Sequence, residues 1–129
     1  MTHAAARRLR LAPLTLLLLA ACTDAGPVSG AGTLTASLVS PNGPEGAAVV
    51  VLFGDGLGPV SAAGGAEVYS HEGVGSMRLV LIHPTGGEIA FQVAVADTTQ
   101  PPTFVLVEVA GPDDALRADL SEYSVEVVR

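Results

Sequence analysis

The sequence contains no lysine and no tryptophan, a single cysteine and few aromatic residues. One cysteine excludes a disulfide framework within the chain and a zinc site built from several thiolates. Positive charge is equally scarce, because downstream of residue 21 only three arginines remain beside all thirteen acidic residues, a formal charge of −10. Such a chain repels phosphate backbones, so we expect no nucleic-acid partner.

The other three arginines lie in the first ten residues, ahead of an apolar run from Leu11 to Ala21 that ends at the single Cys22. A basic head, a short apolar stretch and small residues before a cleavage point are typical of a secretory signal. The run is too short for a spanning helix, which needs about 20 residues. The first 21 residues are therefore predicted to be an export signal.

The four residues Leu19-Ala20-Ala21-Cys22 resemble the lipobox of bacterial lipoproteins. The resemblance implies cleavage before Cys22, diacylglycerol on its thiol and a fatty acid such as palmitate on the new amino end. Several acyl chains would hold the protein at a membrane of the cell envelope. Thr23, rather than aspartate, follows the cysteine, which favours the outer membrane if the host has two. The alternative is an ordinary secreted protein with a free thiol.

Three regions follow from this interpretation: a signal peptide at 1–21, the lipidated Cys22 with a flexible tether at 22–32, and one domain at 33–129. The tether is small, polar and glycine-rich, with nothing to bury. The domain has a length that suits a single hydrophobic core.

Short β-type runs separated by turn residues fill the domain. Residues 33–39 and 122–128 alternate apolar with polar, so each has one buried face. The run 47–53 is apolar on both faces and is expected to be central, whereas the polar run 66–72 suits an edge strand. Residues 76–83 and 88–96 are predicted to pair as a hairpin, with Ile89, Phe91, Val93 and Val95 on one face.

Residues 103–110 complete the set of strands, and residues 111–120 are the only helix-like piece. There Asp113 or Asp114 would cap a single turn, and Leu116 and Leu120 would share one side. About seven or eight strands with no long helix predict one antiparallel β-sandwich of the immunoglobulin-like or cohesin-like kind.

The succession of "GAAVVVLF", "GSMRLVLI", a glycine turn and "GEIAFQVAV" is similar to the early half of cohesin-type modules. The similarity covers roughly residues 46–110 and rests on pattern. Cohesins are longer β-sandwiches that bind dockerin modules through one sheet face. The resemblance therefore implies protein binding, and it assigns no individual contact residue.

The most concentrated polar set is Glu67, Tyr69 and His71, on one face of an alternating strand. His71 and Glu67, with or without His83, would make a metal site of imidazole and carboxylate, or Tyr69 would stack on a sugar ring. The alternative is a solvated strand of mixed polar residues. Phe104 is the one further candidate platform for a glycan, since the pattern turns Phe53, Phe91 and Tyr123 inward.

Two further acidic positions, Asp55 in "GDG" and the pair Asp113-Asp114, would supply oxygen ligands to calcium, or would simply serve turns and helix starts. Ser76 in "GVGSMR" is the nearest approach to a hydrolase nucleophile, but the G-x-S-x-G pattern is absent. We therefore expect no enzyme activity and no cofactor.

The sequence thus predicts a membrane-anchored envelope lipoprotein whose sandwich is a non-catalytic interaction or assembly module with an unidentified protein partner. A ligand-binding accessory domain around Glu67, Tyr69 and His71 is the main alternative, and a hydrolase is the remote one.

Overall fold

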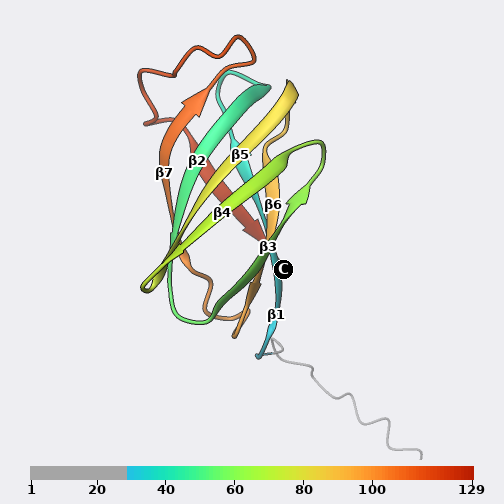
Figure 1. Ribbon diagram of the computed structural model, residues 1–129, viewed down its shortest axis with the longest axis vertical. Coiled ribbons are helices and arrows are strands. Elements are labelled where there is room, and N and C mark those ends of the chain that lie inside the picture. The colour runs from blue at the N-terminus through green and yellow to red at the C-terminus, as the bar shows by residue number, and fades with distance from the viewer. Residues whose placement is uncertain (1–28) are drawn as a thin grey trace, which may run out of the picture.

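The computed structural model describes residues 29–129, which form a single β-sandwich without helices (Figure 1). Eight strands make two four-stranded antiparallel sheets, as the alternating pattern predicted. The predicted signal peptide, Cys22 and most of the predicted tether lie outside the described residues. The strands are β1 (Gly32–Val39), β2 (Glu45–Phe53), β3 (Leu57–Ala63), β4 (Glu67–Gly73), β5 (Ser76–Gly87), β6 (Ala90–Val95), β7 (Thr103–Ala110) and β8 (Ser124–Val128).

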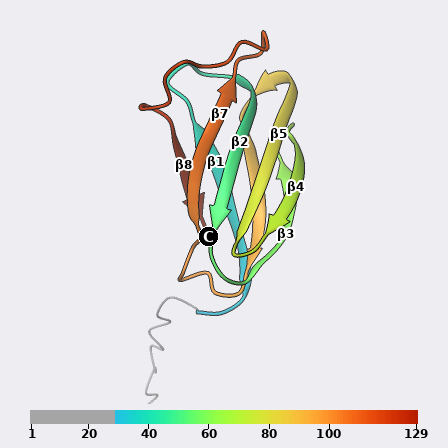
Figure 2. The ribbon, with the colours of Figure 1, turned by 60° about the vertical axis from the view of Figure 1, so that its left-hand side comes forward.

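The first sheet has the strand order β3-β6-β1-β8, and the second has the order β4-β5-β2-β7. Figure 2 shows β7, β2 and β5 in one layer with β1 behind them. As expected, β2 is central in its sheet and β4 is an edge strand. Strand β3 was not predicted. It contains Pro59, which is tolerated because β3 is an edge strand and pairs only with β6.

The predicted hairpin between residues 76–83 and 88–96 is wrong. Strand β5 pairs with β2 and β4, whereas β6 pairs with β1 and β3, so the connection between them crosses from one sheet to the other. Ile89 makes this crossing: it is 2% exposed, and its carbonyl accepts a hydrogen bond from the Leu38 amide. The shared face of Ile89 and the β6 residues is confirmed, because this face lines the core.

The predicted helical turn at 111–120 is also wrong. The Gly111 amide donates to the Ala115 carbonyl, the reverse of the helical direction, and an isolated bridge joins Ala110 to Leu116. Asp114 has a left-handed φ of 63°, which ends any helical path. Leu116 is consequently 69% exposed, and only Leu120 packs against the core.

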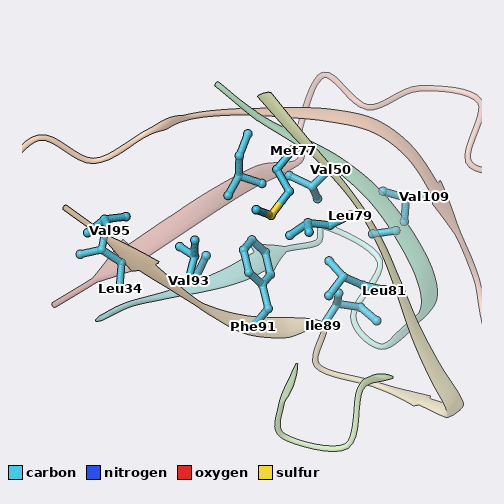
Figure 3. Close-up of a cluster of buried hydrophobic side chains, with 13 residues drawn as sticks. Leu34, Val50, Met77, Leu79, Leu81, Ile89, Phe91, Val93, Val95 and Val109 are labelled. Atoms are coloured by element: carbon cyan, nitrogen blue, oxygen red, sulfur yellow. The ribbon is translucent and has the colours of Figure 1, made fainter. Parts of the chain in front are cut away.

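The core lies between the two sheets and consists of inward aliphatic side chains around Phe91 (Figure 3). The Phe91 ring packs against that of Phe104 from β7, with centroids 6.2 Å apart and a tilt of 52°. The fully buried members include Leu34, Leu52, Leu79, Leu81, Val50 and Val93. Burial of these groups is the main term that stabilises the fold.

The two ends of the sandwich differ in what they carry. Strand β1 begins at one end, and the loop between β7 and β8 lies at the opposite end (Figure 1). At that far end the chain passes close to itself, since a Cβ on Gly46 would lie 2.5 Å from the carbonyl oxygen of Gly111. Within residues 29–129, no helix is long and apolar enough to cross a membrane.

Candidate interaction surface

The predicted polar set Glu67, Tyr69 and His71 lies on β4, and all three residues are exposed. They face outward from the sheet, because their neighbours on β5 are the outward Ile82, Val80 and Arg78, while Val68 and Ser70 pair with buried leucines. The Tyr69 hydroxyl donates a hydrogen bond of 3.3 Å to Glu67 Oε2.

The same three residues are spread along the strand rather than gathered at one point. Glu67 and His71 are four positions apart, which separates their Cα atoms by about 13 Å. His83 follows Ile82, the residue opposite Glu67, and so lies at the far end from His71. Among residues 29–129, no group of three His, Cys, Asp or Glu side chains is arranged to hold a metal ion. The glycan alternative stays a prediction.

Large apolar side chains make up much of the rest of this outward surface, with Arg78 of β5 opposite Val51 and Glu108 of β7 opposite Val49 among them. We call the apolar members the outer valine face. It follows from the register, since residues between the buried positions of β2, β5 and β7 point away from the core. Its members are Tyr69 of β4, Val80 and Ile82 of β5, Val49, Val51 and Phe53 of β2, and Val105 of β7. Phe53 is 47% exposed and Val105 is 43% exposed.

The prediction that Phe53 points inward is wrong, whereas those for Phe91 and Tyr123 are confirmed: Phe91 is buried and Tyr123 packs against the core. Alternation explains the difference. Leu52 occupies the inward position at the end of β2, so its neighbour Phe53 must point outward. The apolar character of β2 on both faces therefore does not reflect burial on both faces within residues 29–129.

The outer face of the other sheet is more polar, although Val39 and Val128 are exposed on it where β1 pairs with β8. The same register argument assigns to it hydroxyl, amide and acidic side chains: Thr33, Thr35 and Ser37 of β1, Ser61 of β3, Gln92 of β6, and Ser124 and Glu126 of β8. The two faces have the same backbone geometry and differ in chemistry. Contiguous exposed apolar surface marks interaction sites more often than isolated apolar residues do.

A second polar feature, not predicted, is the buried Glu45 at the start of β2, which is 1% exposed. Its Oε1 accepts hydrogen bonds of 2.7 Å from both the Ser40 and Tyr123 hydroxyls. Its Oε2 accepts from Arg117 Nε at 3.1 Å and from the terminal guanidinium nitrogen at 3.0 Å. Asn42 Nδ2 also donates to the Tyr123 hydroxyl, at 2.6 Å. We call these five residues the Glu45 clasp.

The hydrogen bonds of the Glu45 clasp indicate a structural role for Glu45. Both carboxylate oxygens accept two hydrogen bonds each, so the group has no lone pair available to take a proton from a substrate. The clasp joins the first turn and β2 to the loop between β7 and β8. The clasp therefore holds this loop in place, although the loop has no regular secondary structure.

Burial pushes the pKa of the Glu45 carboxyl upward, because the charged form loses its water. The hydrogen bonds from Ser40, Tyr123 and Arg117, together with the charge of Arg117, outweigh this effect. The pKa of folded Glu45 therefore lies below its usual value near 4.5. Stability that depends on ionised Glu45 is complete above the unfolded pKa and is lost as the pH falls through the folded one.

We therefore expect the free energy of unfolding to fall as the pH drops below about 4.5, the ordinary glutamate range. In Glu45→Gln, the fall over the same pH range should be shallower, because one depressed carboxyl no longer titrates. Urea unfolding at a series of pH values between 6 and 3 measures both slopes. Asp97 and Asp119, whose pKa values are also lowered, stay in both proteins. Parallel slopes would contradict the role assigned to Glu45.

The acidic calcium candidates lie in turns. Asp55 is exposed between β2 and β3. Asp113 Oδ1 accepts a hydrogen bond of 3.4 Å from the Ala115 amide, and the Asp114 amide donates to the Gly111 carbonyl at 3.0 Å. Ser76 begins β5 opposite Gly73, and no hydrogen bond within residues 29–129 joins it to His71 or His83.

Comparison with known proteins gives no assignment, since no family model, curated protein or solved structure matches this chain.

Proposed function

We propose that this chain is a lipid-anchored protein of the cell envelope and that its β-sandwich is a non-catalytic protein-interaction module, with the outer valine face as the contact surface. One observation carries this proposal. The outer valine face exposes large apolar side chains from all four strands of its sheet, whereas the opposite face of the same sandwich carries mainly hydroxyl, amide and acidic groups.

The energetics favour a protein partner. Covering exposed apolar surface is worth about 25 cal/mol for each Å² removed from water. The two aromatic members, Phe53 and Tyr69, combine large contact area with few rotatable bonds, and aromatic residues dominate binding energy at interfaces. Glu67 and His71 of the edge strand β4 supply a polar rim of the kind that such interfaces have, and Arg78 lies within the face between His71 and Val51.

The anchor part of the proposal is supported by sequence. The lipobox-like residues Leu19 to Cys22 place the lipid ten positions before Gly32, where β1 begins. Thr23 favours the outer membrane in a host with two membranes. The acidic domain gains nothing from contact with anionic headgroups or nucleic acid, which leaves the lipid as the only membrane contact.

The contact surface is tested by comparing two double variants of the full chain in its native envelope. Val51→Ser with Phe53→Ser changes the outer valine face, and Thr35→Ala with Gln92→Ala changes the opposite face as a matched control. After mild cross-linking and affinity capture, we expect partner recovery to fall at least tenfold for the first pair, since aromatic anchors contribute about 2 kcal/mol or more. The control pair should retain recovery.

Thermal unfolding of both double variants shows whether either one is destabilised. If the control pair lost as much partner as the first pair, or if the first pair lost none, the outer valine face would not be the contact surface. A lipidated tether lacking residues 33–129 identifies proteins captured through the anchor alone.

A further inference from the structure

The sandwich has four edge strands, and three of them carry features that discourage pairing with another chain. Strand β3 contains Pro59 and a register shift against β6. Strand β7 has a register shift against β2, and β8 is only five residues long. Such shifts and short lengths blunt an edge, and proline removes a hydrogen-bond donor.

Strand β4 has none of these features. It pairs with β5 in unbroken register over all seven residues, from Glu67 opposite Ile82 to Gly73 opposite Ser76. It contains no proline, and it pairs with no other strand, so its second edge presents unpaired backbone groups. Strand β4 is therefore the longest edge strand of residues 29–129 with unbroken pairing, and the features that protect it are the charges of Glu67 and Glu72. A partner strand must therefore keep these two carboxylates away from other acidic groups.

We propose that this edge binds β4 of a second copy of the chain, antiparallel, with a two-fold axis at Ser70. Ser70 is the midpoint of β4, so this is the register that pairs all seven residues. Two copies joined in this way form one continuous eight-stranded sheet. The inference goes beyond the proposed function and does not depend on which protein the outer valine face binds.

The side chains fit this register. Ser70 meets Ser70 of the second copy, Tyr69 meets His71, Val68 meets Glu72, and Glu67 meets the small Gly73. Each acidic residue of β4 is thus opposite an uncharged one, although the domain as a whole is strongly acidic. Like charges directly opposite would destabilise the pair, whereas two facing hydroxyls can hydrogen-bond.

The self-paired edge also extends the proposed contact surface. Tyr69 and His71 point outward, so the two copies of this pair would lie at the seam between two outer valine faces. The continuous sheet would present both faces side by side, which gives one assembly two adjoining contact surfaces. Simultaneous binding of two sites raises avidity without any new contact.

The test introduces a thiol at the two-fold axis. Directly opposed residues of an antiparallel pair have Cα atoms about 4.5 to 5.5 Å apart, within the range that a disulfide spans. In the full chain, purified in detergent with Cys22→Ser so that the new thiol is alone, Ser70→Cys should form a disulfide-linked dimer under mild oxidation. Ser61→Cys, also an exposed serine on an edge strand, is the matched control.

We expect the linked fraction of Ser70→Cys to exceed that of Ser61→Cys by about tenfold or more, because only Ser70 lies on the axis. Light scattering should give a dimer mass for the chain with Cys22→Ser alone, and a monomer mass when Ser70→Asp is added, because that change places two like charges opposite each other. Three results would overturn the inference. They are equal disulfide linking at Ser70→Cys and Ser61→Cys, a monomer mass for the chain with Cys22→Ser alone, and a dimer mass that persists in Ser70→Asp. Partner capture is measured separately, so the absence of a β4-linked dimer would not contradict the proposed function.

Discussion

Replacing Arg117 with methionine is expected to lower the free energy of unfolding by about 2 kcal/mol, because it removes half of the hydrogen bonds of a buried carboxylate, although Arg117 itself is 28% exposed. Glu45 is 1% exposed, and Arg117 supplies two of its four hydrogen bonds and its only counter-ion within residues 29–129. The variant leaves a buried carboxylate with two hydroxyl donors and no positive charge. Urea unfolding at neutral pH, where Glu45 is ionised, measures the loss.

Two comparisons separate the ion pair from a general effect of losing arginine. Arg78 lies exposed on β5 and has no ion pair among the described residues, so Arg78→Met should change stability by only about 0.5 kcal/mol. Glu45→Leu combined with Arg117→Met should cost less than Arg117→Met alone, because no charge remains buried. If the double variant were as unstable as the sum of its single changes, the two residues would not be coupled.

Phe91→Ala is expected to cost about 4 kcal/mol, which is typical of a large aromatic side chain removed from a core. The Phe91 ring is 2% exposed and lies between the sheets against Phe104, so its removal leaves a cavity lined by leucines and valines. The surrounding sheets are held in register and cannot close the space. Urea unfolding or calorimetry measures the loss.

Phe53→Ala is the matched control, because it makes the same chemical change on the outer valine face. Phe53 is 47% exposed, so its removal opens no cavity and should cost less than about 1 kcal/mol. Equal losses at the two phenylalanines would mean that the outer valine face is part of the stabilising core. The account of a free contact surface would then be wrong.

Alternation was sufficient to predict most of the sandwich. Strand β8 turns Val125 and Val127 toward the core as expected, and Ile89 and Phe91 share the buried face. Strand β3 was not predicted because its alternation of apolar and polar residues is interrupted. Leu57 and Val60 both pair with inward residues of β6, but a register shift lies between them. Glycine and proline in that stretch looked like a turn.

The alternation of apolar and polar residues along a strand does not show which of the two sheets the strand belongs to. A glycine turn between two apolar runs favours a hairpin, but it does not say whether the chain returns to the same sheet. Glu88 and Ile89 instead carry the chain from one sheet to the other, and the choice depends on pairing between β6 and β1, whose paired residues are 53 to 63 positions apart. The loop at 111–120 also depends on a distant residue, since Arg117 is bound to Glu45, in addition to the left-handed φ of Asp114 that ends a helical path.

The Glu45 clasp could not have been read from the sequence. Its partners Arg117 and Tyr123 lie 72 and 78 positions away, and nothing near a glutamate in a turn indicates burial. The outer valine face did leave a signal, because β2 is apolar on both sides. That pattern ordinarily predicts a strand covered on both faces, and among residues 29–129 only the inner face of β2 is covered by the other sheet.

Site-specific photo-cross-linking tests the central claim most directly. A photoreactive phenylalanine analogue at position 53 reports what touches the outer valine face in the native envelope, and the same analogue at position 35 reports on the polar face as a control. The account predicts a discrete protein adduct from position 53 that is absent from position 35. Equal adducts from both positions, or none from position 53, would contradict a protein-interaction role for this face.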